Sequence, residues 1–128
     1  MYKFDKNHQF HFTDFNQPMG LKMNPENRWI RLRDICIQLG KIVQKYNEKK
    51  YYVIQIKALY DIVKCVDSDI DEKEKTEYVL NRYKILYPSH GGLSEFYIQD
   101  EDFATRLKLN EPVDMLKDDL WKIIKPYI

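Results

Sequence analysis

Residues 31–46 read Arg-Leu-Arg-Asp-Ile-Cys-Ile-Gln-Leu-Gly-Lys-Ile-Val-Gln-Lys-Tyr, and this stretch decides the fold class. Its apolar side chains recur at intervals of three and four, at Leu32, Ile35, Cys36, Leu39, Ile42, Val43 and Tyr46. That spacing places them on one face of an α-helix. Gly40 lies within the stretch, where glycine costs about 1 kcal/mol relative to alanine, so we expect another group to pack closely against it.

Two further helices are predicted after this one. An apolar stripe runs along residues 52–66, and the short turn before it predicts a helical hairpin with residues 31–46. Ser68 followed by Asp71 has the spacing of a capping box, which predicts the start of a third helix. Pro88 is expected to end that helix.

The C-terminal part predicts a turn and two more helical pieces. Residues 93–98 are aromatic-rich and fit either a short strand or an ordered turn. Residues 100–102, Asp-Glu-Asp, suit the first turn of a brief helix that carries Phe103 and Leu107. Asn110 followed by Pro112 is typical of an N-cap and first turn, so a separate last helix is expected from there.

Residues 1–30 show no sustained periodicity, and only residues 9–12 alternate as a short strand would. The predicted fold class is therefore mainly α, a small helical bundle of four to five helices with an irregular N-terminal arm and room for one short strand or hairpin. Residues 1–30 form the predicted arm and residues 31–128 the helical domain. Because the helical stripes look complete without it, we expect the arm to be largely dispensable for folding.

Composition supports one small domain in which a core can form without disulfides. Hydrophobic residues make up 44% of the 128 residues and charged residues 32%, which suits amphipathic helices with solvated outer faces. The net charge of +1 conceals an asymmetry. Residues 1–67 hold 12 Lys/Arg against 7 Asp/Glu, whereas residues 68–128 hold 9 against 13. The asymmetry indicates either a charged partner, with the second half as the candidate surface for a basic one, or simply solvated helix faces.

The two cysteines, Cys36 and Cys65, both fall within helix patterns and are expected to be buried small hydrophobic residues. Neither a secretory h-region nor a run of eighteen apolar residues occurs, so we expect a cytoplasmic protein with no membrane partner. His8 and His11 form an H-x-x-H pair, but zinc needs three or four ligands and the sequence nearby supplies no others. We expect no metal and no cofactor.

Residues 89–95, Ser-His-Gly-Gly-Leu-Ser-Glu, contain a possible nucleophile and base. The G-x-S-x-G elbow of serine hydrolases is absent, and so are both phosphate-binding glycine motifs. Paired glycines after a helix more simply supply positive φ at its C-terminal end. We therefore expect no catalytic residue, and we expect the turn either to position its neighbours or to take part in recognition.

Two sets of residues are the candidate sites. The partner-binding set combines the turn with the acidic run, in which complementary charge steers a basic partner, and comprises His90, Gly91, Gly92, Asp100, Glu101 and Asp102. The alternative is a nucleic-acid surface of cations beside an aromatic side chain, comprising Arg28, Trp29, Arg31 and Arg33.

Residues 9–32 resemble the opening of bacterial insertion-sequence transposases of the DDE class. The resemblance rests on Phe15-Asn16-Gln17-Pro18 and on Asn24-Pro25-Glu26-Asn27-Arg28-Trp29. It stops after about a quarter of the chain, and the catalytic carboxylates of that family are missing. It therefore implies a fused leader without transposase activity, which leaves a nucleic-acid-associated remnant as the alternative function.

Residues 31–128 resemble a small bacterial helical domain of unknown function. The resemblance is carried by residues 83–87, by the Gly-Gly turn with its aromatic segment at residues 91–98, and by Asn110-Glu111 with Leu116 and Leu120-Trp121. That family often reads Gly-Gly-Met-Gly-Ser-Phe-Asn-Asp-Leu at the turn, and this chain departs from it after the glycines. Such domains look like immunity or accessory proteins that act by binding. The expected function is therefore a non-catalytic protein-binding domain, immunity-like in character.

Overall fold

The computed structural model describes residue 12, residues 27–47 and residues 51–128. Within these residues the fold is a small all-α bundle, which confirms the predicted fold class. Its elements are α2 (Arg28–Lys45), α3 (Val53–Val66), α4 (Glu72–Leu86), the 3₁₀ helix η2 (Gly92–Glu95), α5 (Phe103–Ile124) and the 3₁₀ helix η3 (Lys125–Tyr127). No helix in the described part of the chain is both long and apolar enough to cross a bilayer.

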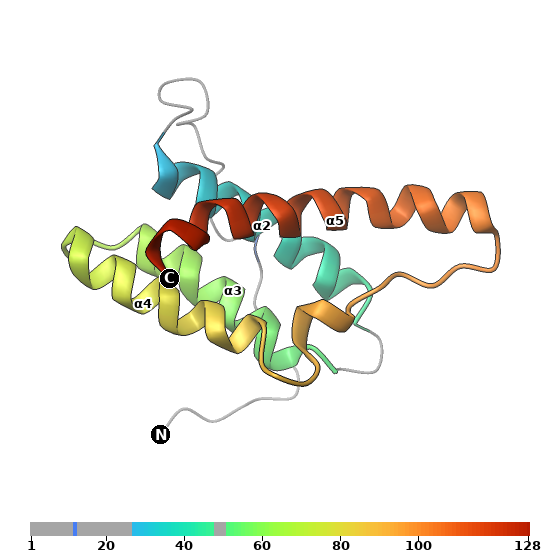
Figure 1. Cartoon of the computed structure of the whole chain (residues 1–128), viewed down its shortest axis with the longest axis horizontal. Helices are drawn as coiled ribbons and strands as arrows, with labels where there is room; N and C mark the ends of the chain where they lie inside the picture. The colour runs from blue at the N-terminus through green and yellow to red at the C-terminus, as the bar shows by residue number, and fades with distance from the viewer. Residues whose placement is uncertain (1–11, 13–26, 48–50) are drawn as a thin grey trace.

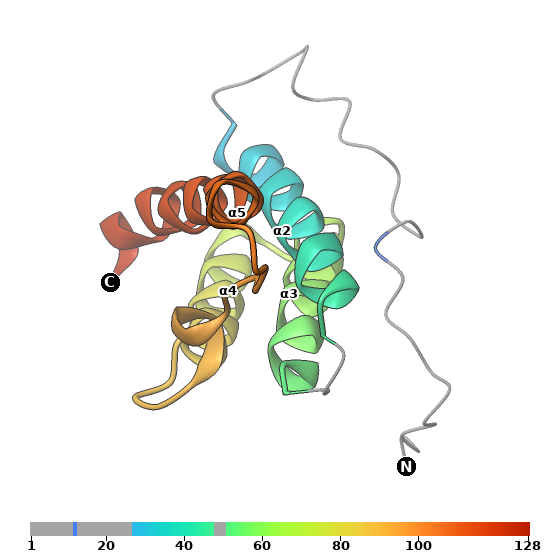
Figure 2. The ribbon, with the colours of Figure 1, turned by 90° about the vertical axis from the view of Figure 1, so that its right-hand side faces the viewer.

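The four α-helices form two layers, with α2 beside α5 in one and α3 beside α4 in the other (Figure 1, Figure 2). Each helix contributes at least one fully buried leucine to the shared core, among them Leu39, Leu59, Leu86 and Leu120. The predicted stripe of residues 31–46 faces this core, and α3 returns alongside α2 as the hairpin predicts. Cys36 and Cys65 are buried free thiols, as expected.

The starts of α2 and α4 differ from prediction. The Asn27 side chain accepts hydrogen bonds from the N–H groups of Trp29 and Ile30, at 2.9 and 3.3 Å, so α2 begins at Arg28 and the predicted boundary at residue 30 falls inside it. At α4 the predicted capping box is wrong. Asp71 is the N-cap and accepts from the Glu74 N–H at 2.8 Å, whereas the Ser68 hydroxyl donates to the Cys65 carbonyl.

The predicted break at Asn110 is also wrong, because α5 runs without interruption from Phe103 to Ile124. Asp102 is its N-cap, and Pro112 lies inside the helix, where it lacks the N–H that would bond to the Lys108 carbonyl. Asn110 cannot act as a cap because its side chain is turned inward, only 5% exposed, and bonded to the backbone of Ile98. Tertiary contacts thus override a local signal that favours a helix start.

Residues 93–95 belong to the 3₁₀ turn η2, which leads directly into an extended stretch alongside α5. That stretch, residues 96–100, is called the extended segment below. No residue in the described part of the chain pairs with it as a β-strand. The short strand expected over residues 9–12 lies, apart from Phe12, outside the described residues.

Phe12 belongs to the core. Its side chain is 1% exposed, its ring lies edge-on to Tyr60 with centroids 5.9 Å apart, and it covers Gly40 so closely that any Cβ there would overlap the ring. The close packing expected at Gly40 is confirmed. The predicted independence of the arm, however, does not hold at Phe12, because an isolated aromatic side chain carries no periodicity from which its burial could be predicted.

Candidate functional site

The Gly-Gly turn is fixed by its own backbone requirements. Gly91 and Gly92 have φ of 77° and 73°, which confirms the positive φ predicted for them. The Glu95 carboxylate accepts from the Gly91 N–H at 3.0 Å, and the Ser94 hydroxyl donates to the Gly91 carbonyl at 3.0 Å. His90 is exposed beside them. The hydroxyl and carboxylate that resembled catalytic groups therefore close the turn.

We expect Gly92→Ala to lower the free energy of unfolding by more than about 1 kcal/mol, because alanine resists positive φ. A Cβ at Gly92 would also lie 2.5 Å from the Leu86 carbonyl oxygen, whereas nothing lies near the same position on Gly91. Gly91→Ala should therefore cost less, and His90→Ala should be nearly neutral. Urea unfolding of the three variants tests this order, and a Gly92→Ala protein as stable as wild type would contradict it.

The acidic run lies at the start of α5, and two of its members are occupied by local hydrogen bonds. Asp102 accepts from both the N–H and the hydroxyl of Thr105, at 2.9 and 2.7 Å, and these bonds lower the pKa of its carboxyl. Asp100 accepts from the Asp102 N–H at 2.8 Å. Glu101 is exposed. The first two side chains organise the helix start, while Glu101 presents its charge to solvent.

The two halves of the predicted partner-binding set are apart in space. The Gly-Gly turn follows the end of α4, whereas Asp100, Glu101 and Asp102 lie at the far end of the extended segment, and Figures 1 and 2 agree on this separation. The set is therefore two features, and the acidic one adjoins the exposed side chains of Phe103 and Leu107.

Those apolar side chains lie on the overhang, which we define as residues 103–111 of α5. Figure 1 shows this half of the helix running beyond the ends of α3 and α4, with only the extended segment alongside. Phe103 and Leu107 are 59% and 55% exposed, and they are neighbours on one helix face because they are four residues apart. The Arg106 guanidinium lies 5.3 Å from the centroid of the Phe103 ring.

Carboxylates border this pair. Asp102 and Glu101 lie at its N-terminal side, and Glu111 and Asp114 follow on the exposed surface of the same helix. Residues 100–114 hold five carboxylates against two cations, Arg106 and Lys108. Sequence reasoning missed this surface because it divided α5 at Asn110. If residues 103–124 are taken as one helix, Phe103 and Leu107 fall on a different face from the buried residues Val113, Leu116 and Leu120.

The overhang is held in place by polar side chains that contact the extended segment. Asn110 accepts from the Ile98 N–H at 2.9 Å and donates to the Ile98 carbonyl at 2.8 Å. Lys117 Nζ donates to the Phe96 carbonyl at 3.1 Å, and burial lowers the pKa of Lys117. Arg106 donates to the Asp100 carbonyl at 3.1 Å. The surface that carries Phe103 and Leu107 is thereby fixed to the bundle.

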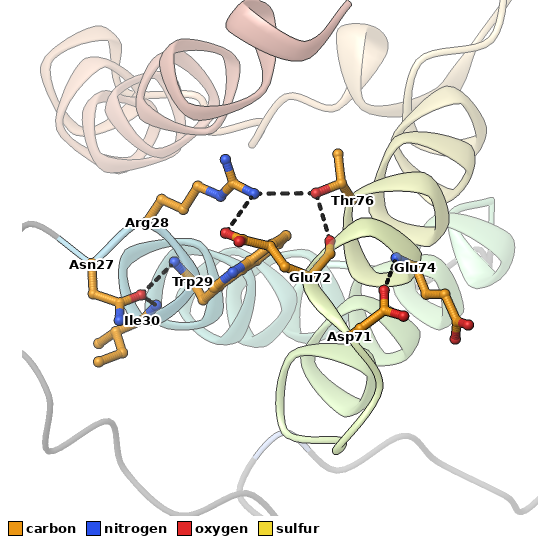
Figure 3. Close-up of polar contacts among 8 residues, drawn as sticks. All are labelled: Asn27, Arg28, Trp29, Ile30, Asp71, Glu72, Glu74 and Thr76. Carbon is orange, nitrogen blue, oxygen red and sulfur yellow. Dashed lines mark hydrogen bonds and ion pairs between the residues drawn. The ribbon is translucent and has the colours of Figure 1, made fainter.

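Most side chains of the predicted nucleic-acid-binding set make contacts within the protein, and Figure 3 shows those of Arg28. The guanidinium of Arg28 donates to Glu72 Oε1 at 3.2 Å and to Thr76 Oγ1 at 3.1 Å. It also lies 4.4 Å from the centroid of the Trp29 ring and 4.2 Å from that of Tyr127. Arg28 therefore joins α2 to α4 and to η3, and it is not displayed for a nucleic acid.

Arg33 is likewise engaged. It is buried and makes a two-pronged ion pair with Asp67, at 2.6 and 3.2 Å, which joins the start of α2 to the end of α3. Trp29 packs against the core. Of the four residues proposed for nucleic-acid binding, Arg31 is the exposed one.

A hollow of about 250 Å³ lies over α3 and α4 and is lined by Asp61, Lys64, Cys65, Ile70 and Tyr78. Its carboxylate is already occupied, because Asp61 Oδ2 is 2.8 Å from Lys57 Nζ and 4.0 Å from Arg82 Nη1. Burial raises the pKa of the Cys65 thiol, which Lys75 only partly offsets, so Cys65 is protonated at neutral pH and a poor nucleophile.

The described part of the chain brings no three His, Cys, Asp or Glu side chains together as a metal site. His8 and His11 lie outside the described residues. Among the exposed apolar side chains of the described residues, Phe103 and Leu107 are the pair that directly follows the predicted acidic run. In comparisons with protein families, curated proteins and solved structures, the chain matches none, so both family resemblances stay predictions.

Proposed function

We propose that this chain is a non-catalytic protein-binding domain, immunity-like in character, and that it binds a basic protein through the overhang of α5. The observation that carries the proposal is the exposed pair Phe103 and Leu107 beside the carboxylates of residues 100–102. Phe103 and Leu107 are neighbours and are both more than half exposed, so together they offer apolar surface area that a partner can bury.

The shape and charge of the overhang favour a protein over other ligands. Small-molecule sites are concave, whereas Phe103 and Leu107 stand on a projecting helix end (Figure 1). A nucleic acid would bring phosphates towards Glu101, Glu111 and Asp114, which repel them. A basic protein fits both the shape and the charge of the overhang. Its cations are attracted by the carboxylates, and its apolar side chains can cover Phe103 and Leu107.

The test is affinity capture from a lysate of the source cells on the immobilised full chain. Phe103→Ser with Leu107→Ser is expected to lose the basic proteins that wild type retains, because the apolar contact is removed. Met115→Ser is the matched control, since Met115 is 59% exposed on the same helix but on another face. Circular dichroism should show that both variants fold alike.

Charge is tested separately with Glu101→Lys, which avoids the capping carboxylates Asp100 and Asp102. This variant should slow association with the captured protein, and the difference should shrink at high salt. Proteins retained equally by wild type and by the Phe103/Leu107 variant would contradict the proposal. Binding to random-sequence duplex DNA with a steep salt dependence would instead favour the nucleic-acid alternative.

A further inference from the structure

The extended segment has the alternation of a β-strand with one buried face. Phe96 and Ile98 are buried, whereas Tyr97 is 46% exposed and Gln99 is exposed. Successive side chains of an extended chain point to opposite sides, so this pattern follows from packing one side of the segment against the bundle.

Side chains of α5 satisfy the backbone of the segment along one edge. Asn110 pairs with both the N–H and the carbonyl of Ile98, as a residue on a neighbouring strand would. Lys117 donates a hydrogen bond to the carbonyl of Phe96, two residues before Ile98, and Arg106 donates one to the carbonyl of Asp100, two residues after it. Every second residue of the segment is thus hydrogen-bonded towards α5.

The opposite edge is open. The backbone groups of Tyr97 and Gln99 point away from α5, because hydrogen-bonding direction alternates along an extended chain. Across the described ranges, no group hydrogen-bonds to the backbone N–H or carbonyl of either residue. Such an edge is a ready template for a further strand.

The charges around this edge select its occupant. Residues 95–102 contain Glu95, Asp100, Glu101 and Asp102 and no Lys or Arg. Pairing of two copies of the segment would bring like charges opposite one another, which disfavours a second copy of this chain. An extended segment rich in Lys or Arg would place cations opposite these carboxylates instead.

We propose that the protein partner adds a basic, extended segment as a β-strand on the open edge of residues 97–99. This rests on the proposed function, because the same basic partner would cover Phe103 and Leu107 immediately beyond the acidic run. The strand supplies backbone hydrogen bonds and register, and the overhang supplies apolar contact.

The experiment uses the full chain and two synthetic probes. The first is an acetylated, amidated hexapeptide of alternating Lys and Val, and the second is the same peptide N-methylated at all six residues, which keeps the charges but removes the backbone N–H donors of both edges. In amide NMR spectra the first probe should shift the Tyr97 and Gln99 resonances and slow their hydrogen exchange. The N-methylated probe should do neither.

Gln99→Pro and Gln99→Ala form the matched pair of variants. Proline removes the Gln99 N–H, and its fixed φ suits an extended chain and leaves Ile98 extended, so the bonds of Asn110 should persist. Unchanged Asn110 side-chain resonances would verify this. Gln99→Pro should weaken binding of the first probe by about tenfold, as expected for losing one backbone hydrogen bond, and Gln99→Ala should bind as wild type does.

Equal binding to Gln99→Pro and wild type, or equal binding of the two peptides, would overturn strand addition. So would an absence of shifts at Tyr97 and Gln99 with millimolar peptide. Shifts confined to Phe103 and Leu107 would overturn strand addition while leaving the proposed surface in place. The capture experiment with the Phe103/Leu107 variant decides that surface independently.

Discussion

Replacing Phe12 with alanine is expected to lower the free energy of unfolding by about 3–5 kcal/mol, the usual cost of removing a buried aromatic side chain. The ring is almost fully buried, lies edge-on to Tyr60 and covers Gly40 of α2. Chemical unfolding monitored by circular dichroism measures the loss. A loss of only a few tenths of a kcal/mol would show that the ring contributes little to the core.

Gly40→Ala supplies the decisive control, because its effect should change sign with the residue at position 12. In wild type, the new Cβ displaces the Phe12 ring and the variant is destabilised. With Phe12→Ala already in place, the clash disappears and alanine stabilises α2 by about 0.5–1 kcal/mol over glycine. Additive effects of the two substitutions would rule out the contact.

The second large effect is expected at Asn110. Asn110→Leu should lower the free energy of unfolding by about 2–4 kcal/mol, because the Ile98 N–H and carbonyl would remain buried without partners. The isostere Asn110→Asp keeps the acceptor for the Ile98 N–H but loses the donor to the carbonyl. At neutral pH it should still destabilise, since the new carboxylate would be buried and would face that carbonyl oxygen.

Lys108→Ala is the control for Asn110, since Lys108 is exposed on the neighbouring turn of α5 and alanine keeps the helix propensity. Urea unfolding compares the three variants, and hydrogen exchange of the Ile98 amide reports directly on the lost bond. An Asn110→Leu protein as stable as Lys108→Ala would mean that Asn110 does not hold the extended segment to α5.

Signals that reside within one helix were predicted well from the sequence. The stripe of residues 31–46, the stripe of residues 52–66 and the stop at Pro88 depend on spacing along a single element. The positive φ of Gly91 and Gly92 was predicted for the same reason, because it is a property of each residue's own backbone.

Contacts between distant parts of the chain were not predicted. Nothing in the spacing of residues indicates that Phe12 covers Gly40, or that Arg28 and Arg33 pair with Glu72 and Asp67. The sequence therefore predicts a free basic surface that includes Arg28 and Arg33, whereas both side chains form ion pairs within the protein.

The same limit affected the candidate site. Asn110 followed by Pro112 is a strong local start signal, and only the backbone of Ile98 explains why the asparagine is used differently. Asp100, Glu101 and Asp102 lie at a helix start, but the prediction that they form its first turn is wrong, because α5 begins at Phe103 with Asp102 as its N-cap. The apolar pair Phe103 and Leu107 was visible in the sequence, but its exposure depends on α5 being continuous.

Pro112 has a consequence for how this helix opens. Because proline has no N–H, the hydrogen-bond ladder of α5 is weakest between residues 108 and 112, where the overhang meets the packed half. Unfolding of residues 103–111 would release Leu109 and break the bonds of Asn110 to Ile98, while Leu116 and Leu120 lie in the packed half beyond Pro112. The overhang is therefore expected to fray as a separate cooperative unit, with a lower opening free energy than the bundle. Capture of a partner would then suppress that local opening and appear as added protection at a distance from the core.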